Sequence, residues 1–210
     1  MGVPEPATHV RLERDVRARC DAGDHAGAAT AILQGYGPEI FGFLMAIHRD
    51  RAEADEVFAE LAEGIWTGLP RFAWESSVRT WAYSVARHAS TTRLRNAKRR
   101  ERRVVHRTGS FFEEVAEKVR TETSAFLRTA RKTRLEELRD ALPEEDRSLL
   151  VLRIDRGLAW KDLARILSET DPAHPPDEEF LARESARLRK RFQVVKDRLR
   201  EMARREGLVG

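Results

Sequence analysis

Hydrophobic residues recur along most of the chain with the three-to-four-residue spacing of an amphipathic α-helix. In the segment 52–66 the apolar residues share one face: Ala54, Val57, Phe58, Leu61 and Ile65. The stretch 39–48 is apolar on nearly all sides, which is typical of a deeply buried helix. Sustained alternation of apolar and polar residues, the pattern of a strand, is nearly absent. The pattern therefore predicts an all-α protein.

Residues that favour helix ends mark where these helices begin and stop. Asp24 and Asp177 are expected N-caps, and either Ser77 or Thr80 can cap a helix that starts beside them. Gly35-Tyr36-Gly37 is expected to end one helix, with Pro38 in the first turn of the next. The expected helices cover about 10–22, 24–34, 38–48, 52–66, 77–103, 135–142, 143–156, 159–167 and 177–205.

These helices group into two small helical domains joined by a linker. The expected divisions are a tail with a short helix (1–23), a first domain (24–103), a linker that is partly helical from about Glu113 (104–130) and a second domain (131–210). In the second domain, the last helix is basic and follows a shorter helix after a break. That order predicts a helix-turn-helix, although a charged, solvent-exposed helix would show the same pattern.

Charge is segregated along the chain, although the net charge is only +4. Acidic clusters occupy 53–63, 136–146 and 169–179, whereas basic clusters occupy 93–103 and 183–205. This distribution indicates two kinds of partner. Cys20 is the only cysteine, which excludes an intrachain disulfide and fits a reducing cytoplasm. With neither a long apolar run nor a secretion signal, we expect a cytoplasmic protein without membrane insertion.

Catalytic and metal-binding motifs are missing from the sequence. There is no HExxH, glycine-rich phosphate loop or nucleophile elbow, and the six histidines are scattered. We therefore expect no enzyme activity, no metal and no cofactor.

Two neighbouring segments carry the chemistry that remains. Helix 52–66 has a second, acidic stripe, formed by Glu53, Glu56, Glu60 and Glu63. The stripe is consistent either with a solvated helix face or with a docking surface for a basic partner. The stretch 69–103 follows it and combines aromatic residues with arginines, the mixture that holds an unstacked nucleic-acid strand. Within that stretch, Trp81 is expected to be a core residue.

Three motifs in these segments resemble one family. ADEVFAELAEGIWTGLPRF (54–72), ESSVRTWAYSVARHASTTRLR (75–95) and LRDALPEEDRSLLVLRIDRGLAWKDLARIL (138–167) are similar to the extracytoplasmic-function (ECF) sigma factors of bacterial RNA polymerase. The resemblance covers about 25–100 and 130–205. It implies that 24–103 is region 2, which docks on core polymerase and recognises and melts the −10 element. It implies likewise that 131–210 is region 4, which binds the −35 element and the β flap.

The resemblance also implies roles for individual residues. It assigns contacts with the polymerase β′ clamp helices to Asp55, Glu56, Phe58, Glu60 and Trp66. The loop at 71–80 captures a base flipped from the non-template strand. DNA contacts in region 2 fall to Arg71, Phe72, Trp74, Ser76, Ser77, Arg79, Thr80, Tyr83, Arg87, His88, Thr91 and Arg95. Those in region 4 fall to Arg187, Arg189, Lys190 and Arg191. Whether an anti-sigma factor is a further partner is left open.

The chain departs from the family pattern at several positions. Ala59 and Ala62 replace a usual Gln and Phe, and His88 and Thr92 replace a usual Asn and Asp. An insertion from Ser168 to about Glu184 separates the two helix-turn-helix helices and is expected to lengthen the second. A stand-alone helix-turn-helix repressor is the main alternative function. An all-helical adaptor and an RNA-binding antiterminator are two more.

Overall fold

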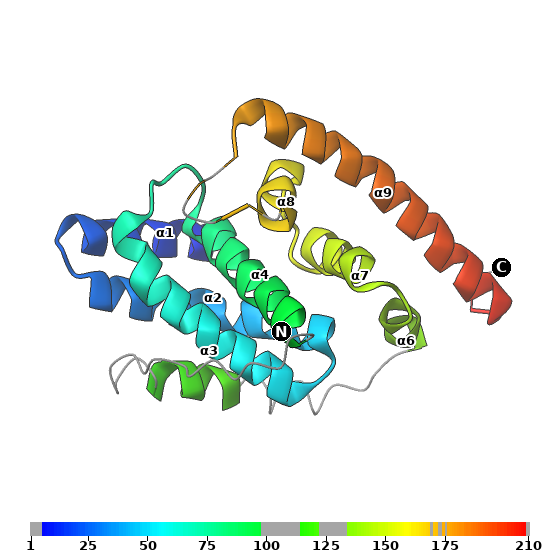
Figure 1. Cartoon of the computed structure of the whole chain (residues 1–210), viewed down its shortest axis with the longest axis horizontal. Coiled ribbons are helices and arrows are strands. Elements are labelled where there is room, and N and C mark those ends of the chain that lie inside the picture. The colour runs from blue at the N-terminus through cyan, green and yellow to red at the C-terminus, as the bar shows by residue number, and fades with distance from the viewer. Residues whose placement is uncertain are drawn as a thin grey trace.

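The computed structural model describes residues 6–97, 114–121, 134–168, 170–171, 174 and 176–208, and over these residues it is helical without strands (Figure 1). The all-α prediction is confirmed. The elements are α1 (Pro6–Asp21), α2 (His25–His48), α3 (Arg51–Gly68), the 3-10 turn η1 (Leu69–Arg71), α4 (Val78–Ala97), a helix at 114–121, α6 (Arg134–Asp140), α7 (Glu144–Leu150), the π-helical turn η2 (Val151–Asp155), α8 (Trp160–Leu167) and α9 (Glu178–Arg205). No helix in the described ranges combines the length and apolar character needed to cross a membrane.

Helices α1 to α4 pack into the N-terminal half of the molecule, with α2 at its centre (Figure 1). The predicted core face of α3 is confirmed, since all five of its apolar residues are fully buried. Most of α2 is buried as well. The helix at 114–121 lies against α2 and α3, with Val119 beside Gly37 and Phe58. Part of the predicted linker is therefore packed on the N-terminal half.

The predicted break at Gly35-Tyr36-Gly37 is wrong, because α2 runs without interruption through Pro38. Proline inside a helix removes one hydrogen bond and crowds the preceding turn, so the helix must be held by its surroundings. Both glycines are points of close packing here. A Cβ at Gly35 would lie 2.1 Å from Leu12 Cδ2, and one at Gly37 would lie 2.9 Å from Val119 Cγ1. Glycine is therefore needed at both positions for close packing against other parts of the chain, and not to end a helix.

The predicted caps are confirmed at three helices. Asp24 Oδ1 accepts a hydrogen bond from the backbone N–H of Gly27 (2.8 Å). At the start of α4, Ser77 Oγ accepts one from the N–H of Thr80 (3.0 Å). Asp177 Oδ1 accepts one from Phe180 at α9 (2.7 Å). Each satisfies a backbone donor that the first turn of a helix leaves without an intrahelical partner.

In the C-terminal half, α9 extends along α8 and α7 (Figure 1). The rings of Trp160 and Phe192 meet edge to face at 5.5 Å, and Ser185 Oγ donates to the carbonyl of Trp160 (3.2 Å). The last part of the insertion, from Glu178, forms the first turns of α9. That the insertion lengthens this helix relative to the family stays a prediction. A helix-turn-helix joins its helices by three or four residues, so that assignment stays a prediction.

The two halves of the chain are in direct contact. Buried residues of α2, α3 and α4 form one continuous apolar cluster with residues of α7, η2, α8 and α9. Arg147 of α7 is buried, and its guanidinium donates to the carbonyl of Ile47 in α2 (3.0 Å). Arg49 donates in turn to the carbonyl of Asp140 (2.6 Å). The division into two domains stays a prediction. Most of the expected linker, the tail 1–5 and the basic residues 98–103 lie outside the described residues.

Candidate nucleic-acid interface

The acidic stripe of α3 has a basic partner within the chain. Arg93 of α4 donates through Nε to Glu53 (2.7 Å), and its Nη1 lies 3.6 Å from both Glu56 and Glu60. The hydrogen bond with Glu53 and the three carboxylates raise the pKa of Arg93 above its ordinary value, against the effect of burial. One arginine cannot neutralise the whole stripe, so α3 presents a net negative surface.

The five residues expected to contact polymerase differ in their accessibility. Glu56 is exposed, and Asp55 and Glu60 are half-buried. Trp66 is 37% exposed at the far end of the helix, whereas Phe58 is fully buried against Phe41. Four of the five therefore reach the surface of α3. Phe58 lies inside the core in this conformation and supports the helix from within.

The loop between η1 and α4 is built on stacked aromatic rings. Phe72 stacks on Trp81 with ring centroids 4.9 Å apart. The ring of Trp74 is tilted relative to that of Phe72, and their centroids are also 4.9 Å apart. Trp81 is buried, which confirms its expected core role. Phe72 and Trp74 are half-buried and pack against the core, although the sequence places them in a loop. The loop thus carries two half-buried rings that pack on the buried Trp81.

Trp74 has an unusual backbone conformation. Its φ is 61°, in the left-handed region that non-glycine residues rarely adopt. The guanidinium of Arg17 in α1 lies 4.3 Å above its ring and helps to hold it there. Such strain persists only where the surroundings impose it, and it is concentrated at functional sites.

The first turn of α4 is fixed by a residue from α1. The carboxylate of Glu13 accepts hydrogen bonds from the backbone N–H groups of Val78 (2.9 Å) and Arg79 (3.0 Å). It also accepts one from the hydroxyl of Tyr36 (2.9 Å). Ser76 is half-buried and Ser77 and Arg71 are exposed in the loop that leads to this turn.

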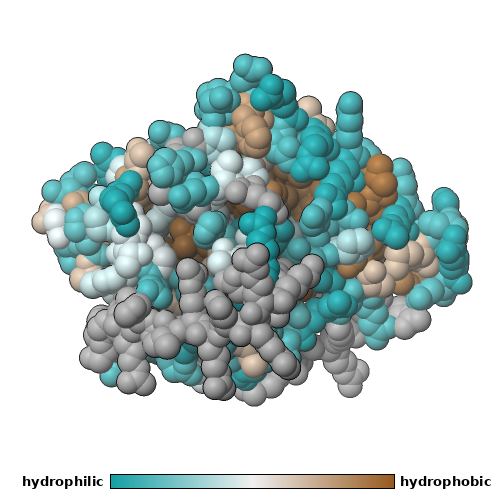
Figure 2. Space-filling view, in the orientation of Figure 1, coloured by the Kyte–Doolittle hydropathy of each residue, from teal (hydrophilic) through white to brown (hydrophobic). Residues whose placement is uncertain are grey.

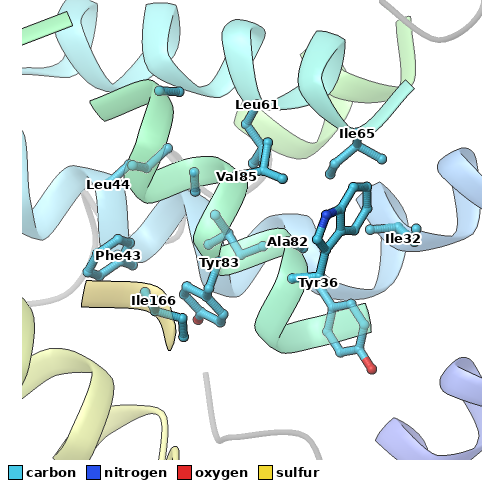
Figure 3. Packing of buried hydrophobic residues seen from close by; sticks show 14 of the residues in the cluster. Ile32, Tyr36, Phe43, Leu44, Leu61, Ile65, Ala82, Tyr83, Val85 and Ile166 are labelled. Atoms are coloured by element: carbon cyan, nitrogen blue, oxygen red, sulfur yellow. The ribbon is translucent and has the colours of Figure 1, made fainter. Parts of the chain in front are cut away.

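The face of α4 expected to read DNA is turned toward other parts of the chain. Arg79 forms a bidentate pair with Glu39 of α2, at 2.7 and 2.9 Å, and its Nη2 also donates to the carbonyl of Arg156 (3.1 Å). Burial alone would lower the pKa of Arg79, but Glu39 raises it above its ordinary value. Thr80 and Tyr83 are buried. In Figure 3, Tyr83 points toward Ile166 of α8.

One turn further along, Arg87 is buried and forms an ion pair with Glu144 at the start of α7. Thr91 is half-buried, and its hydroxyl donates to the carbonyl of Arg87 (3.1 Å). His88 and Arg95 are exposed. The structure therefore places these residues on one helix, where Arg79 is half-buried and Thr80, Tyr83 and Arg87 are buried against neighbouring elements.

The predicted contacts of α9 are more open. Arg189 and Lys190 are exposed, and Arg189 also lies over the ring of Trp160 (5.7 Å). Arg187 is exposed and pairs with Glu184 within the helix. Arg191 donates to Asp146 (2.7 Å) and Glu145 (2.5 Å), both in the first turn of α7.

Sequence reasoning missed three carboxylates that organise this interface: Glu13, Glu39 and Glu144. Glu39 offered a signal, because it is the only charged residue in an otherwise apolar stretch. Glu144 lies at the start of the expected helix 143–156, a position that indicates nothing about an arginine partner. Nothing local to Glu13 indicates that it caps a helix far along the chain. Within the described ranges, no group of three or more His, Cys, Asp or Glu side chains could hold a metal ion.

Comparison with known proteins agrees with this geometry. Residues 32–100, which include α3, the aromatic loop and α4, match the family described as sigma-70 region 2. The chain is similar to the RNA polymerase sigma-H factor of Pseudomonas aeruginosa, with 26% identity over 153 residues that cover 71% of this chain and 79% of that protein. No solved structure matches. Residues 32–100 therefore match region 2 of the sigma-70 factors of bacterial RNA polymerase, and the chain is similar to a sigma factor over most of its length.

Proposed function

We propose that this chain is an ECF-type sigma factor, which binds core RNA polymerase in the cytoplasm and directs promoter recognition and DNA melting. The observation that carries the proposal is the match of residues 32–100 to sigma-70 region 2, over the segment that joins an acidic helix to an aromatic, arginine-bearing loop and helix. The family works as a subunit of polymerase and does no covalent chemistry itself.

Within this function, α3 is the surface for a basic polymerase helix. Its accessible carboxylates and the partly exposed Trp66 combine a charged rim with an aromatic anchor, as protein interfaces commonly do. Arg93 competes for the same carboxylates, so a polymerase arginine or lysine has to displace it or share the site.

The loop at 71–80 and α4 then read the −10 element. Opening the duplex costs a few kcal/mol per unstacked base, whereas stacking on an aromatic ring returns about 1–3 kcal/mol. Phe72 and Trp74 supply such rings without ATP. In the C-terminal half, the exposed Arg187, Arg189 and Lys190 of α9 are the contacts proposed for the −35 element, while the same half docks on the β flap.

Binding to purified bacterial core polymerase tests the docking surface. Glu56→Lys with Glu60→Lys reverses two carboxylates one turn apart on α3 and should abolish capture of core enzyme. Asp197→Lys with Glu201→Lys makes the same change at the same spacing on α9, where both side chains are exposed. If the α3 pair still binds core as tightly as the α9 pair, the docking assignment is wrong.

Removal of Arg93 should strengthen binding to core polymerase, where the lysine substitutions on α3 weaken it. Arg93→Ala should uncover three carboxylates and raise the association rate with core by roughly two- to tenfold at low salt. The gain should shrink as ionic strength rises past about 0.15 M, because salt screens exposed charges.

A gel shift with and without core enzyme separates the sigma factor from a stand-alone repressor. Run-off transcription of genomic fragments first identifies a promoter that the chain and core use together. A sigma factor should shift that promoter strongly only with core present. Tight binding of a palindromic duplex by the chain alone would favour the repressor.

A further inference from the structure

Helix α1 follows the aromatic loop and contacts it at two places one turn apart (Figure 1). Glu13 accepts hydrogen bonds from the first two backbone N–H groups of α4, where the loop ends. One turn further along α1, the guanidinium of Arg17 lies 4.3 Å from the centre of the Trp74 ring. Residues four apart lie on the same face of a helix, so one face of α1 lines the loop.

Arginines recur along the exposed side of α1. They lie at three-residue intervals: Arg11, Arg14 and Arg17. Residues at this spacing are neighbours on a helix surface, with Cβ atoms about 5–6 Å apart. The acidic residues among them have other partners, because Glu13 caps α4 and Asp15 pairs with Arg19. Neither Arg11 nor Arg14 forms an ion pair within the part of the chain that the structure describes. Helix α1 therefore carries a short basic row that begins at the Trp74 ring.

Arg17 can bind a phosphate while it stays over the Trp74 ring. A guanidinium that lies over an aromatic ring interacts through its face and keeps the N–H groups at its edge for hydrogen bonds. The Nε of Arg17 donates to the carboxylate of Asp21, at 3.2 and 3.3 Å from the two oxygens. Its two terminal nitrogens donate to no acceptor among the described residues. They are therefore open to the oxygens of a ligand, and a phosphate fits this fork of donors.

We propose that this row, the α1 arginine row, binds phosphates of the separated non-template DNA strand beside the base held by the aromatic loop. The proposal rests on the proposed function, since the strand is separated only where the chain and polymerase open a promoter. Proteins that hold single strands combine stacking rings with a positively charged track for the backbone. Phe72 and Trp74 supply the rings, and the α1 arginine row supplies the track. The row precedes residues 32–100, so the match to sigma-70 region 2 assigns it no role.

The α1 arginine row is accessible in the free chain. Helix α1 packs on α2 and leaves Arg11 and Arg14 exposed, whereas Thr80 and Tyr83 of α4 are buried. The face of the molecule seen in Figure 2 is largely hydrophilic, with small and separate hydrophobic patches. A DNA strand can therefore reach the row without any rearrangement of the chain, and it would be bound there through charge and hydrogen bonds.

Charge removal tests the proposal in the holoenzyme. Chain and core polymerase are mixed with a fluorescein-labelled oligonucleotide, the single non-template strand of the promoter identified by run-off transcription. Arg11→Gln with Arg14→Gln should weaken binding by roughly tenfold at about 0.1 M salt, because two phosphate contacts are lost. The dependence of log Kd on the logarithm of the salt concentration should become shallower by about 1.4, or about 0.7 for each contact with a single strand.

Two further variants control for net charge and for the surface of α1. Arg204→Gln with Arg205→Gln removes the same two charges from the exposed last turn of α9 and should change neither affinity nor salt dependence. Asp21→Asn removes the carboxylate that competes with phosphate for Arg17 and should strengthen strand binding by about twofold. A loss of affinity in Asp21→Asn would contradict a phosphate on Arg17. The melting temperature of each variant shows whether it is folded.

Photocrosslinking locates the strand directly. A Cys20→Ser chain with Arg14→Cys carries a photoreactive aryl azide on its one cysteine, at an exposed position of α1. Illumination of the open complex should join this chain to the non-template strand at the −10 element. The same probe at Arg204→Cys should give no crosslink there. Crosslinking from Arg14→Cys to a polymerase subunit in place of the strand would identify the row as a protein contact and overturn the proposal.

Failure of this inference is distinguishable from failure of the proposed function. If the chain binds core and opens the promoter, but the folded Arg11/Arg14 variant keeps its affinity for the strand and its salt dependence, the α1 arginine row does not bind DNA. An equal loss in the α9 control would reduce the effect to net charge and would overturn the row as well. Failure of the unmodified chain to bind core would instead overturn the proposed function, and the inference with it.

Discussion

The carboxylate of Glu13 lies 2.9 Å from the backbone nitrogen of Val78, the first residue of α4. A helix usually receives its cap from the residue just before it, and Ser77 does bond to Thr80 here. Glu13 adds a second cap from α1. It therefore joins the N-terminal helix to the helix that carries most of the proposed −10 contacts, at the point where the aromatic loop ends.

Removal of this cap should lower stability. Glu13→Ala leaves two backbone donors and the hydroxyl of Tyr36 without their acceptor, and we expect a loss of about 1–3 kcal/mol in the free energy of unfolding. Urea unfolding measures the change. Asp21→Ala, which breaks an exposed pair with Arg17 on the same helix, should cost less than about 0.5 kcal/mol. Equal losses for both substitutions would show that the cap contributes nothing beyond a surface ion pair.

The helices and their buried faces could be predicted from the sequence because both depend on local pattern. The spacing of Val57, Leu61 and Ile65 determines one apolar stripe, and a stripe of that width has to be buried. Caps such as Asp177 are local as well. Helix α2 shows the limit of this reasoning, because the packing of Gly35 and Gly37 against distant residues overrides the tendency of Pro38 to begin a new helix.

The candidate site was predictable only in part, for the same reason. Periodicity and resemblance indicate which residues lie on α4, but not what lies against them. The partners of Arg79 and Arg87 come from α2 and α7, far away in sequence, and no pattern within α4 encodes them. The residue pattern of a helix face, such as the one that carries Tyr83, is the same whether that face contacts DNA or another part of the chain.

The pair between Arg79 and Glu39 should contribute to stability as well as to any contact with DNA. Arg79→Ala leaves the carboxylate of Glu39, which is 5% exposed, without its charged partner. We expect a loss of about 3–5 kcal/mol in the free energy of unfolding. Arg79→Lys should restore only part of it, because an ammonium cannot make the bidentate contact.

A double-mutant cycle of Arg79→Met, Glu39→Met and the variant with both changes isolates this interaction. The double variant removes the charge together with its partner, so it should be more stable than Arg79→Met. Thermal unfolding gives all the values needed. If Arg79→Ala unfolds at the temperature of the unmodified chain, the pair has no structural role, and any loss of DNA binding would then be a direct effect.

His48 should make stability depend on pH. Its Nε2 lies 2.8 Å from Ser90 Oγ, and burial lowers its pKa below the ordinary 6.5. Well above pH 6.5 the ring is neutral in both the folded and the unfolded chain. As pH falls below that value, the unfolded chain takes up a proton that the folded chain refuses, so the free energy of unfolding decreases toward acid.

His48→Gln removes this titration while keeping a side chain that can bond Ser90. Urea unfolding at about pH 8 and about pH 5.5 should show a smaller loss of stability for the variant than for the unmodified chain. His9, whose pKa is also lowered by burial, should retain its own part of the acid sensitivity in both. An identical pH dependence in the two chains would mean that His48 titrates normally in the folded state.

Trp74 allows the role of the aromatic loop to be separated from its stability. Glycine accepts a φ of 61° without strain, so Trp74→Gly relieves backbone strain while it loses the ring contacts with Phe72 and Arg17. These effects oppose each other, and we expect a net change within about 1 kcal/mol. If Trp74 stacks on a flipped base, open-complex formation with core polymerase should nevertheless fall by roughly tenfold or more, since stacking contributes about 1–3 kcal/mol.

Permanganate footprinting of the promoter measures strand opening, and a gel shift with core measures binding before it. Glu75→Gly places a glycine at the next position of the same loop, where the side chain is exposed, and controls for added flexibility. Trp74→Gly should reduce opening far more than initial binding, and Glu75→Gly should reduce neither strongly. Equal losses of strand opening and of initial binding for Trp74→Gly would show that Trp74 acts before melting. A residue that contacts only a flipped base has no contact to lose while the duplex is closed.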